Sequence, residues 1–159
     1  MTEPIHTLTI VTALGSGLVA GVLFAFSTSV MPGLSRLPSA HGIAAMQKID
    51  AAIQNPWFLG AFAGTAVGAA VLGVSSLFRM DEPTAVYHLV GGALYLAAFV
   101  MTMTYHVPRN NALAALDPES AGAARAWTTY VSEWTRWNHA RVILALSAAT
   151  ALTFSLRIR

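Results

Sequence analysis

A polar triplet beside an apolar run carries the chemically most informative side chains of the sequence. Asn138, His139 and Arg141 directly precede Val142 to Leu156, a run of 15 residues without Asp, Glu, Lys or Arg. Because a helix needs roughly 20 residues to cross a hydrocarbon core, we expect the triplet to enter the polar boundary of a membrane. Unpartnered polar groups are costly there. We therefore predict that the three side chains face the interior and one another and form a site.

A stripe of aromatic and polar side chains leads into this triplet. Its members recur at the 3.6-residue period of one helical face: Trp127, Tyr130, Trp134, Trp137, Asn138 and Arg141. His139 points about a third of a turn away from this stripe. The alternative is an ordinary aromatic belt at the membrane interface, with Arg141 reaching the head groups.

The histidines allow several kinds of chemistry. His106 and His139 are predicted at similar depth on different helices, where they could supply a base, bind a metal such as copper, or flank a haem or quinone. Two neutral ligands without a carboxylate are a weak metal signal, and no cysteine supplies a thiolate. We expect no metal site, and we place His88 at a helix end. No Asp or Glu lies within a predicted span, which excludes a di-iron carboxylate centre.

Four uncharged apolar stretches must position these groups. They are Leu8 to Val30, Trp57 to Phe78, Thr84 to Val107, and Val142 to Leu156. Charged residues make up only 10% of the chain, against about 25% in soluble domains. We predict an all-α integral membrane four-helix bundle in one domain, with spans at about 8–30, 57–78, 84–107 and 138–156.

The connections between the spans are predicted as follows. An amphipathic interfacial helix runs from Ser39 to Gln54, with Ile43, Met46, Ile49 and Ile53 on its apolar face and Asp50 elsewhere. Asn55 and Pro56 then begin the second span. We expect Pro108 to lie just beyond the third span, and Asp117-Pro118-Glu119 to start a helical extension that continues into the fourth.

Because successive spans cross the membrane in opposite directions, many of the polar residues gather at one end of the bundle. That end receives Ser27, Ser29, Met31, Asn55, Trp57, Tyr105, His106, Asn110, Trp134, Trp137, Asn138, His139 and Arg141. It also holds six of the nine Lys and Arg residues, which favours the cytoplasmic side of a cell membrane. A net charge of +2 indicates contact with anionic lipid head groups. It is too small to indicate a nucleic-acid-binding surface.

Glycines recur on the first two spans. Gly15, Gly17 and Gly21 face a second set on the next span, formed by Gly60, Gly64 and Gly68. Such ladders let helices approach closely in lipid. We expect packing within the chain, with a homo-oligomer through these faces as the alternative.

Four sequence strings carry a family resemblance: GVLFAFSTSVMP (21–32), QNPWF (54–58), YHVPRNNAL (105–113) and WTTYVSEWTRWNHAR (127–141). Together, and in this order, they resemble the anthrone oxygenase-like family of small membrane proteins. The family motif near the third span often resembles N-V-P-x-N-N, whereas His106 stands before Val107 here. This departure shifts the expected site towards Asn138, His139, Arg141, Asn55 and Asn110.

The resemblance implies oxidation of a polycyclic anthrone to a quinone by molecular oxygen, with no further cofactor. A base removes a benzylic proton, and the electron-rich enolate reacts with oxygen. His139 or His106 is the expected base. Asn138, Asn110 and Arg141 are expected to stabilise the oxyanion. The expected substrate-binding side chains also include Asn55, Trp57, Trp134, Trp137, Tyr105 and Phe26, whose rings stack on a flat substrate that enters from the lipid.

Two other classes of function remain open at this point. One is a small transporter, although proton-coupled export normally uses a membrane-embedded carboxylate. The other is a non-catalytic membrane partner of another enzyme. A closed apolar cavity that reaches the histidine favours an enzyme, an opening to both sides favours a carrier, and a flat polar face favours a scaffold.

Overall fold

A computed structural model describes residues 3–158 of the chain, and these residues form helices without any strand. The elements in chain order are α1 (Glu3–Ala25), the π-helical turn η1 (Phe26–Val30), α2 (Met31–Leu34), α3 (Ser39–Ile53), α4 (Pro56–Ser76), α5 (Ala85–Met101), the π-helical turn η2 (Thr102–His106), α6 (Val107–Ala114) and α7 (Ala123–Ser155). The predicted all-helical class is confirmed.

Three helical stretches are long and apolar enough to cross a membrane. They are Glu3–Leu34, which joins α1, η1 and α2, then Pro56–Ser76, and Ala85–Ala114, which joins α5, η2 and α6. This confirms a membrane-compatible fold. Helix α7 is 33 residues long, but it carries charged residues in its first half and does not meet the same criterion. The fourth span therefore stays a prediction.

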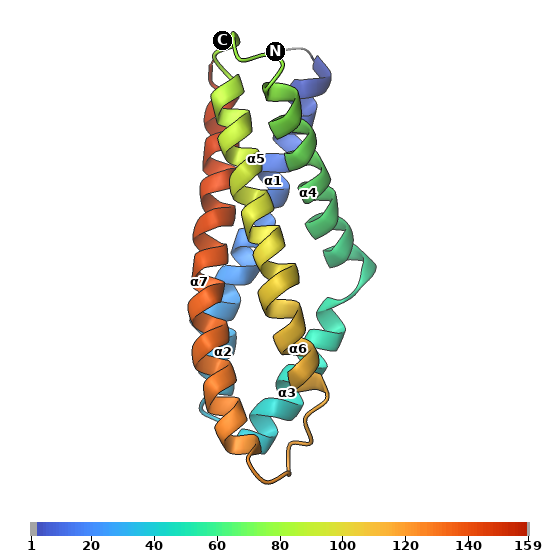
Figure 1. Cartoon of the computed structure of the whole chain (residues 1–159), viewed down its shortest axis with the longest axis vertical. Coiled ribbons are helices and arrows are strands. Elements are labelled where there is room, and N and C mark those ends of the chain that lie inside the picture. The colour runs from blue at the N-terminus through green and yellow to red at the C-terminus, as the bar shows by residue number, and fades with distance from the viewer. Residues whose placement is uncertain (1–2, 159) are drawn as a thin grey trace.

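The four long helices α1, α4, α5 and α7 pack side by side (Figure 1). Helix α1 lies against α7 and α4, and α5 lies against the same two helices. The termini lie at one end, together with the connection between α4 and α5. Helices α3 and α6 lie at the other end, near the start of α7. We call the first the closed end and the second the cavity end.

Small residues bring the helices together towards the closed end. A Cβ added to Gly92 of α5 would lie only 2.6 Å from the carbonyl oxygen of Ala69 and 3.2 Å from Cα of Gly73 in α4. Gly15 of α1 faces Thr65 of α4 in a similarly close contact. A side chain larger than hydrogen would separate these backbones, so the glycines allow the close approach.

Only part of the predicted glycine ladder makes such contacts. Gly15 and Gly68 pack against threonine side chains of the neighbouring helix. The other four ladder positions, Gly17, Gly21, Gly60 and Gly64, have no atom within 4 Å of an added Cβ. The expected packing of α1 on α4 therefore depends on one glycine from each helix.

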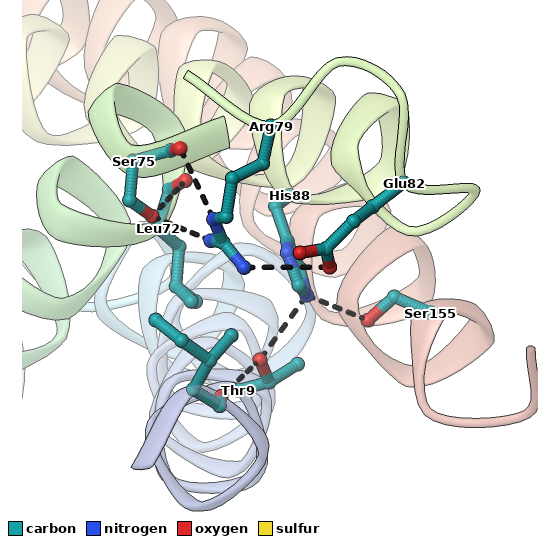
Figure 2. A network of polar contacts seen from close by, with 8 residues as sticks. Thr9, Leu72, Ser75, Arg79, Glu82, His88 and Ser155 are labelled. Carbon is teal, nitrogen blue, oxygen red and sulfur yellow. Dashed lines mark hydrogen bonds and ion pairs between the residues drawn. The ribbon is translucent and has the colours of Figure 1, made fainter. Parts of the chain in front are cut away.

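A polar network ties three helices together at the closed end (Figure 2). Nε2 of His88, in the first turn of α5, lies 3.2 Å from Oγ1 of Thr9 in α1 and 3.2 Å from Oγ of Ser155 in α7. Both hydroxyl hydrogens are already donated to backbone carbonyls. Nε2 of His88 must therefore carry the hydrogen and donate it to the hydroxyl oxygens.

Two predicted helix boundaries are wrong. Pro108 lies inside α6, because the wider π-helical turn η2 just before it accommodates the missing proline N–H. Asp117-Pro118-Glu119 forms a turn, in which Oδ1 of Asp117 accepts from the Glu119 amide at 3.0 Å. Helix α7 begins only at Ala123, after Gly122 with a φ of 93°, a conformation that favours glycine.

Candidate active site

A cavity of about 420 Å³ lies at the cavity end, within the size range of small-ligand pockets. Side chains from α1, η1, α3, α4, α5, η2, α6 and α7 contribute to its wall. Most of the wall is apolar and much of it aromatic, with Phe26, Phe58, Phe62 and Phe99 among the lining residues. Phe62 and Phe99 stack at 5.0 Å between ring centroids. Such a wall suits a flat apolar ligand.

Both π-helical turns lie at this cavity. Phe26 begins η1, and Thr102 and His106 begin and end η2, and all three line the cavity. A π-helical turn rotates the following side chains relative to a regular α-helix, and such turns are frequent at functional sites. The turns therefore direct an aromatic ring, a hydroxyl and an imidazole towards one space.

His106 is the most unusual polar group in this wall. Its side chain is only 1% exposed, and its ring meets the Trp134 ring edge-on at 5.3 Å. Nδ1 lies 3.5 Å from the carbonyl oxygen of Met101. A carbonyl can only accept, so this contact favours the hydrogen on Nδ1. Nε2 is buried and has no hydrogen-bond partner, although His106 lines the cavity.

Arg141 places a guanidinium beside this imidazole site. Its Nη2 donates to Oδ1 of Asn138 at 2.5 Å, and its Nη1 donates to Oγ1 of Thr102 at 3.2 Å. The guanidinium also lies 5.3 Å from the centroid of the Trp134 ring. Nε of Arg141 is buried and has no partner. The Nε–H group of Arg141 is thus unused, and the residue lines the cavity.

Asn138 anchors Arg141 without lining the cavity. It is fully buried, and its Nδ2 donates to the carbonyl oxygen of Leu23 and to Oγ of Ser27, both at 2.7 Å. The sequence-based expectation that Asn138 and Arg141 face the interior and each other agrees with these contacts. A catalytic role for either residue stays a prediction.

Asn110 lies at the centre of a second polar group. Its Oδ1 accepts from the Tyr130 hydroxyl at 2.9 Å and from Nε1 of Trp134 at 3.0 Å. Its Nδ2 donates to Oδ1 of Asp50 at 2.5 Å, and Gln54 donates to the other carboxylate oxygen at 3.2 Å. Burial raises the pKa of Asp50, and these two hydrogen bonds oppose the rise. Asp50, Gln54, Asn110 and Trp134 all line the cavity.

His139 does not belong to this site. It is exposed and absent from the cavity wall, because it follows Asn138 by one residue, about 100° around the helix. The prediction that it faces the interior is wrong. The structure therefore does not bring His139 to the cavity that His106 lines. Residues 3–158 hold no group of three or more His, Cys, Asp or Glu with metal-binding geometry.

Four other predicted binding residues lie outside the cavity wall. Asn55 caps α4, with its Oδ1 accepting from two backbone amides. Trp57, in the first turn of α4, is 89% exposed, and Trp137 is 42% exposed. Tyr105 packs against Trp137 at 5.1 Å and lies under the guanidinium of Arg109. The exposed indoles agree better with a membrane-interface belt than with substrate stacking.

Sequence reasoning missed Asp50 as a residue of this wall. The signal for Asp50 was available, because Ile43, Met46, Asp50 and Ile53 follow the spacing of one helical face. Assigning Ile49 to that face placed Asp50 on the opposite, solvated one. Thr102 precedes His106 by four residues, and this spacing predicts one interior face for both, in agreement with their place in the cavity wall.

The structure defines an all-helical protein with three membrane-length apolar helices and a largely apolar cavity lined by a buried imidazole and guanidinium. The family model for anthrone oxygenase matches residues 54–151, which is more than half of the chain. The chain therefore belongs to the anthrone oxygenase family, and the resemblance seen in the sequence is confirmed. No curated protein and no solved structure matches this chain.

Proposed function

We propose that this protein is a membrane-embedded oxygenase that oxidises a flat polycyclic ketone of the anthrone type with molecular oxygen. The observation that carries the proposal is the buried, unpartnered Nε2 of His106 at an aromatic cavity that Arg141 also lines. The family membership supports an oxygenase-type role. The substrate, the mechanism and the residue roles are our proposals.

Of the two predicted bases, His106 is the base in this proposal, because His139 is exposed and lies outside the cavity wall. Nε2 accepts a proton from the methylene carbon of the anthrone, and the electron pair of that C–H bond passes into the ring system to form an enolate. Molecular oxygen accepts electrons from the enolate and adds to the same carbon as a hydroperoxide. Loss of water then leaves the second carbonyl. One anthrone and one O₂ thus give one quinone and one H₂O, and the proton on His106 returns in the released water.

Arg141 stabilises the enolate oxygen. Two of its nitrogens are held by Asn138 and Thr102, so the free Nε–H is positioned before the substrate binds. A fixed donor in a water-poor cavity stabilises developing negative charge without reorganisation. Phe26, Phe62 and Phe99 provide apolar surface for the rings.

We further propose that α7 supplies a fourth span over about residues 138–156, which completes a four-helix transmembrane bundle. Its polar groups at Asn138 and Arg141 are paired inside the protein, which removes much of their cost in a membrane. The cavity end would face the cytoplasm by its excess of Lys and Arg. Leu59 and Met103 line the cavity and are about half exposed, which supports access of an apolar substrate from the lipid.

The shape of the interior gives less support to a transporter. A carrier needs a path to both membrane sides, whereas the cavity lies at one end and the other end is closed by the contacts of Gly92 and by the His88 network. The structure also gives little support to a scaffold with a flat polar face, because Asp50, His106 and Arg141 line a cavity.

The test uses the purified protein in lipid nanodiscs with anthrone in aerated buffer. We expect quinone formation above the spontaneous rate, with one O₂ consumed per quinone. His106→Gln should lower the catalysed rate by about 10² to 10⁴-fold, the usual contribution of a general base. His139→Gln is the matched control and should retain the rate. A wild-type rate equal to the protein-free rate contradicts the function, and a fully active His106→Gln variant contradicts the assignment of the base.

A further inference from the structure

The cavity has two polar regions of opposite character. Towards the buried side lie Arg141 and His106, each about 4% exposed or less. Towards the opening lie Asp50 and Asn110, both partly exposed, next to the exposed Gln54. A ligand that fills the cavity therefore meets a cationic donor at its inner end and a carboxylate at its outer end.

The carboxylate of Asp50 is held in place but retains acceptor capacity. Asn110 and Gln54 each donate one hydrogen bond to it, and a carboxylate accepts about four in total. Within residues 3–158, no Lys, Arg or His forms an ion pair with it. The nearest fixed partners are thus neutral amides, and the remaining lone pairs are open to a donor from a ligand.

We propose that Asp50 is a specificity-determining residue that binds a hydroxyl group on the end of the aromatic ligand that faces the cavity opening. The inference rests on the proposed function for the ligand class. Asp50 lies on α3, outside the family match at residues 54–151, so the match assigns it no role. The preferred ligand is a polycyclic ketone with its carbonyl oxygen towards Arg141 and a ring hydroxyl at the distant edge.

A charged acceptor discriminates strongly between ligands. A hydroxyl donates to the Asp50 carboxylate in a charge-assisted hydrogen bond, whereas a methoxy group at the same position has no hydrogen to donate. Binding of the methoxy compound removes water from the carboxylate without replacing its hydrogen bond. We therefore expect a preference of about tenfold or more for the hydroxyl compound.

The experiment measures binding by quenching of tryptophan fluorescence, under argon so that no oxidation occurs. The ligands are anthrone, 2-hydroxyanthrone and 2-methoxyanthrone, in which the substituent is meta to the carbonyl-bearing carbon and perturbs the ketone little. The proteins are the wild type, Asp50→Asn, Asp50→Leu and the control Asp117→Asn, which removes the same charge from an exposed turn. Each full-length protein is measured in nanodiscs.

The supporting result is a wild-type preference for 2-hydroxyanthrone over both other ligands that decreases in Asp50→Asn, is lost in Asp50→Leu and is retained in Asp117→Asn. Equal binding of the three ligands by the wild type overturns the inference and leaves the proposed function intact. Retention of the preference in Asp50→Leu also overturns it. If none of the three ligands binds to the wild type, the proposed function fails as well. The wild-type comparison decides the matter even if the Asp50 variants do not fold.

Discussion

Two buried histidines on one helical stretch have opposite surroundings. His88 and His106 are 18 residues apart, five turns of an α-helix, and each is 1% exposed. Nε2 of His88 donates to two hydroxyl groups in a packed network (Figure 2). His106 lines the cavity, and its Nε2 is buried without a hydrogen-bond partner. The neighbours of a buried histidine, more than its burial, decide whether it can act as a base.

The packing of α4 helps to explain why the aromatic cavity lies at one end of the bundle. Near His88, Gly73 and Gly92 let α4 and α5 touch through their backbones. Towards His106, the corresponding positions carry Phe62 and Phe99, and their rings keep the helices apart. Helix α3 crosses below the bundle at this end (Figure 1), and its Asp50 lines the cavity. Glycines thus allow close helix packing at one end, and aromatic residues line a cavity at the other.

After His106→Gln, the largest effect on the cavity end is expected from Arg141→Gln. The substitution removes the charge and the free Nε–H from the cavity, and loss of such a donor typically lowers kcat by about 10² to 10³-fold. The measurement is quinone formation at saturating anthrone. Arg136→Gln, on an exposed position of the same helix, is the control and should keep its kcat. An Arg141→Gln variant with unchanged kcat would remove Arg141 from the mechanism.

His88→Ala should affect stability and not chemistry. It removes the contacts with Thr9 and Ser155 and leaves a small void among three helices, which we expect to cost about 1 to 3 kcal/mol of unfolding free energy. The measurement is the thermal unfolding midpoint in detergent, together with the oxidation rate per folded molecule. Thr9 and Ser155 keep their own backbone hydrogen bonds, which limits the loss. A rate decrease as large as that of His106→Gln, without a change in stability, would contradict the contrast drawn between the two histidines.

The smallest effect is a pH dependence from Asp50. Burial raises its pKa above 3.8, so between 3.8 and the raised value the folded protein binds more protons than the unfolded chain. The unfolding free energy therefore falls as pH rises through this window. Thermal unfolding midpoints measured across the window should show this slope in the wild type. Asp50→Asn should lose it, Asp117→Asn should keep it, and an identical slope in Asp50→Asn would assign it to other groups.

The sequence predicted the elements better than the site. The helix predicted to begin at Ser39 and the inward direction of Asn138 and Arg141 agree with the structure. The inward direction predicted for His139 does not agree. Asn138 of the inward-facing stripe on α7 is buried, whereas the next residue, His139, lies on an exposed face of the same helix. Asp50 was placed on the wrong face of α3, since a boundary residue between two faces can belong to either until the partner helices are known.

The apolar run lengths and the low charge determined by themselves that this chain is helical and suited to a membrane, because a hydrocarbon core imposes a minimum length of uncharged helix. The family membership also follows from the sequence. Only the tertiary structure decided which histidine faces a cavity. That choice depends on π-helical turns and on the side chains that meet from helices far apart in the chain, and neither follows from local periodicity.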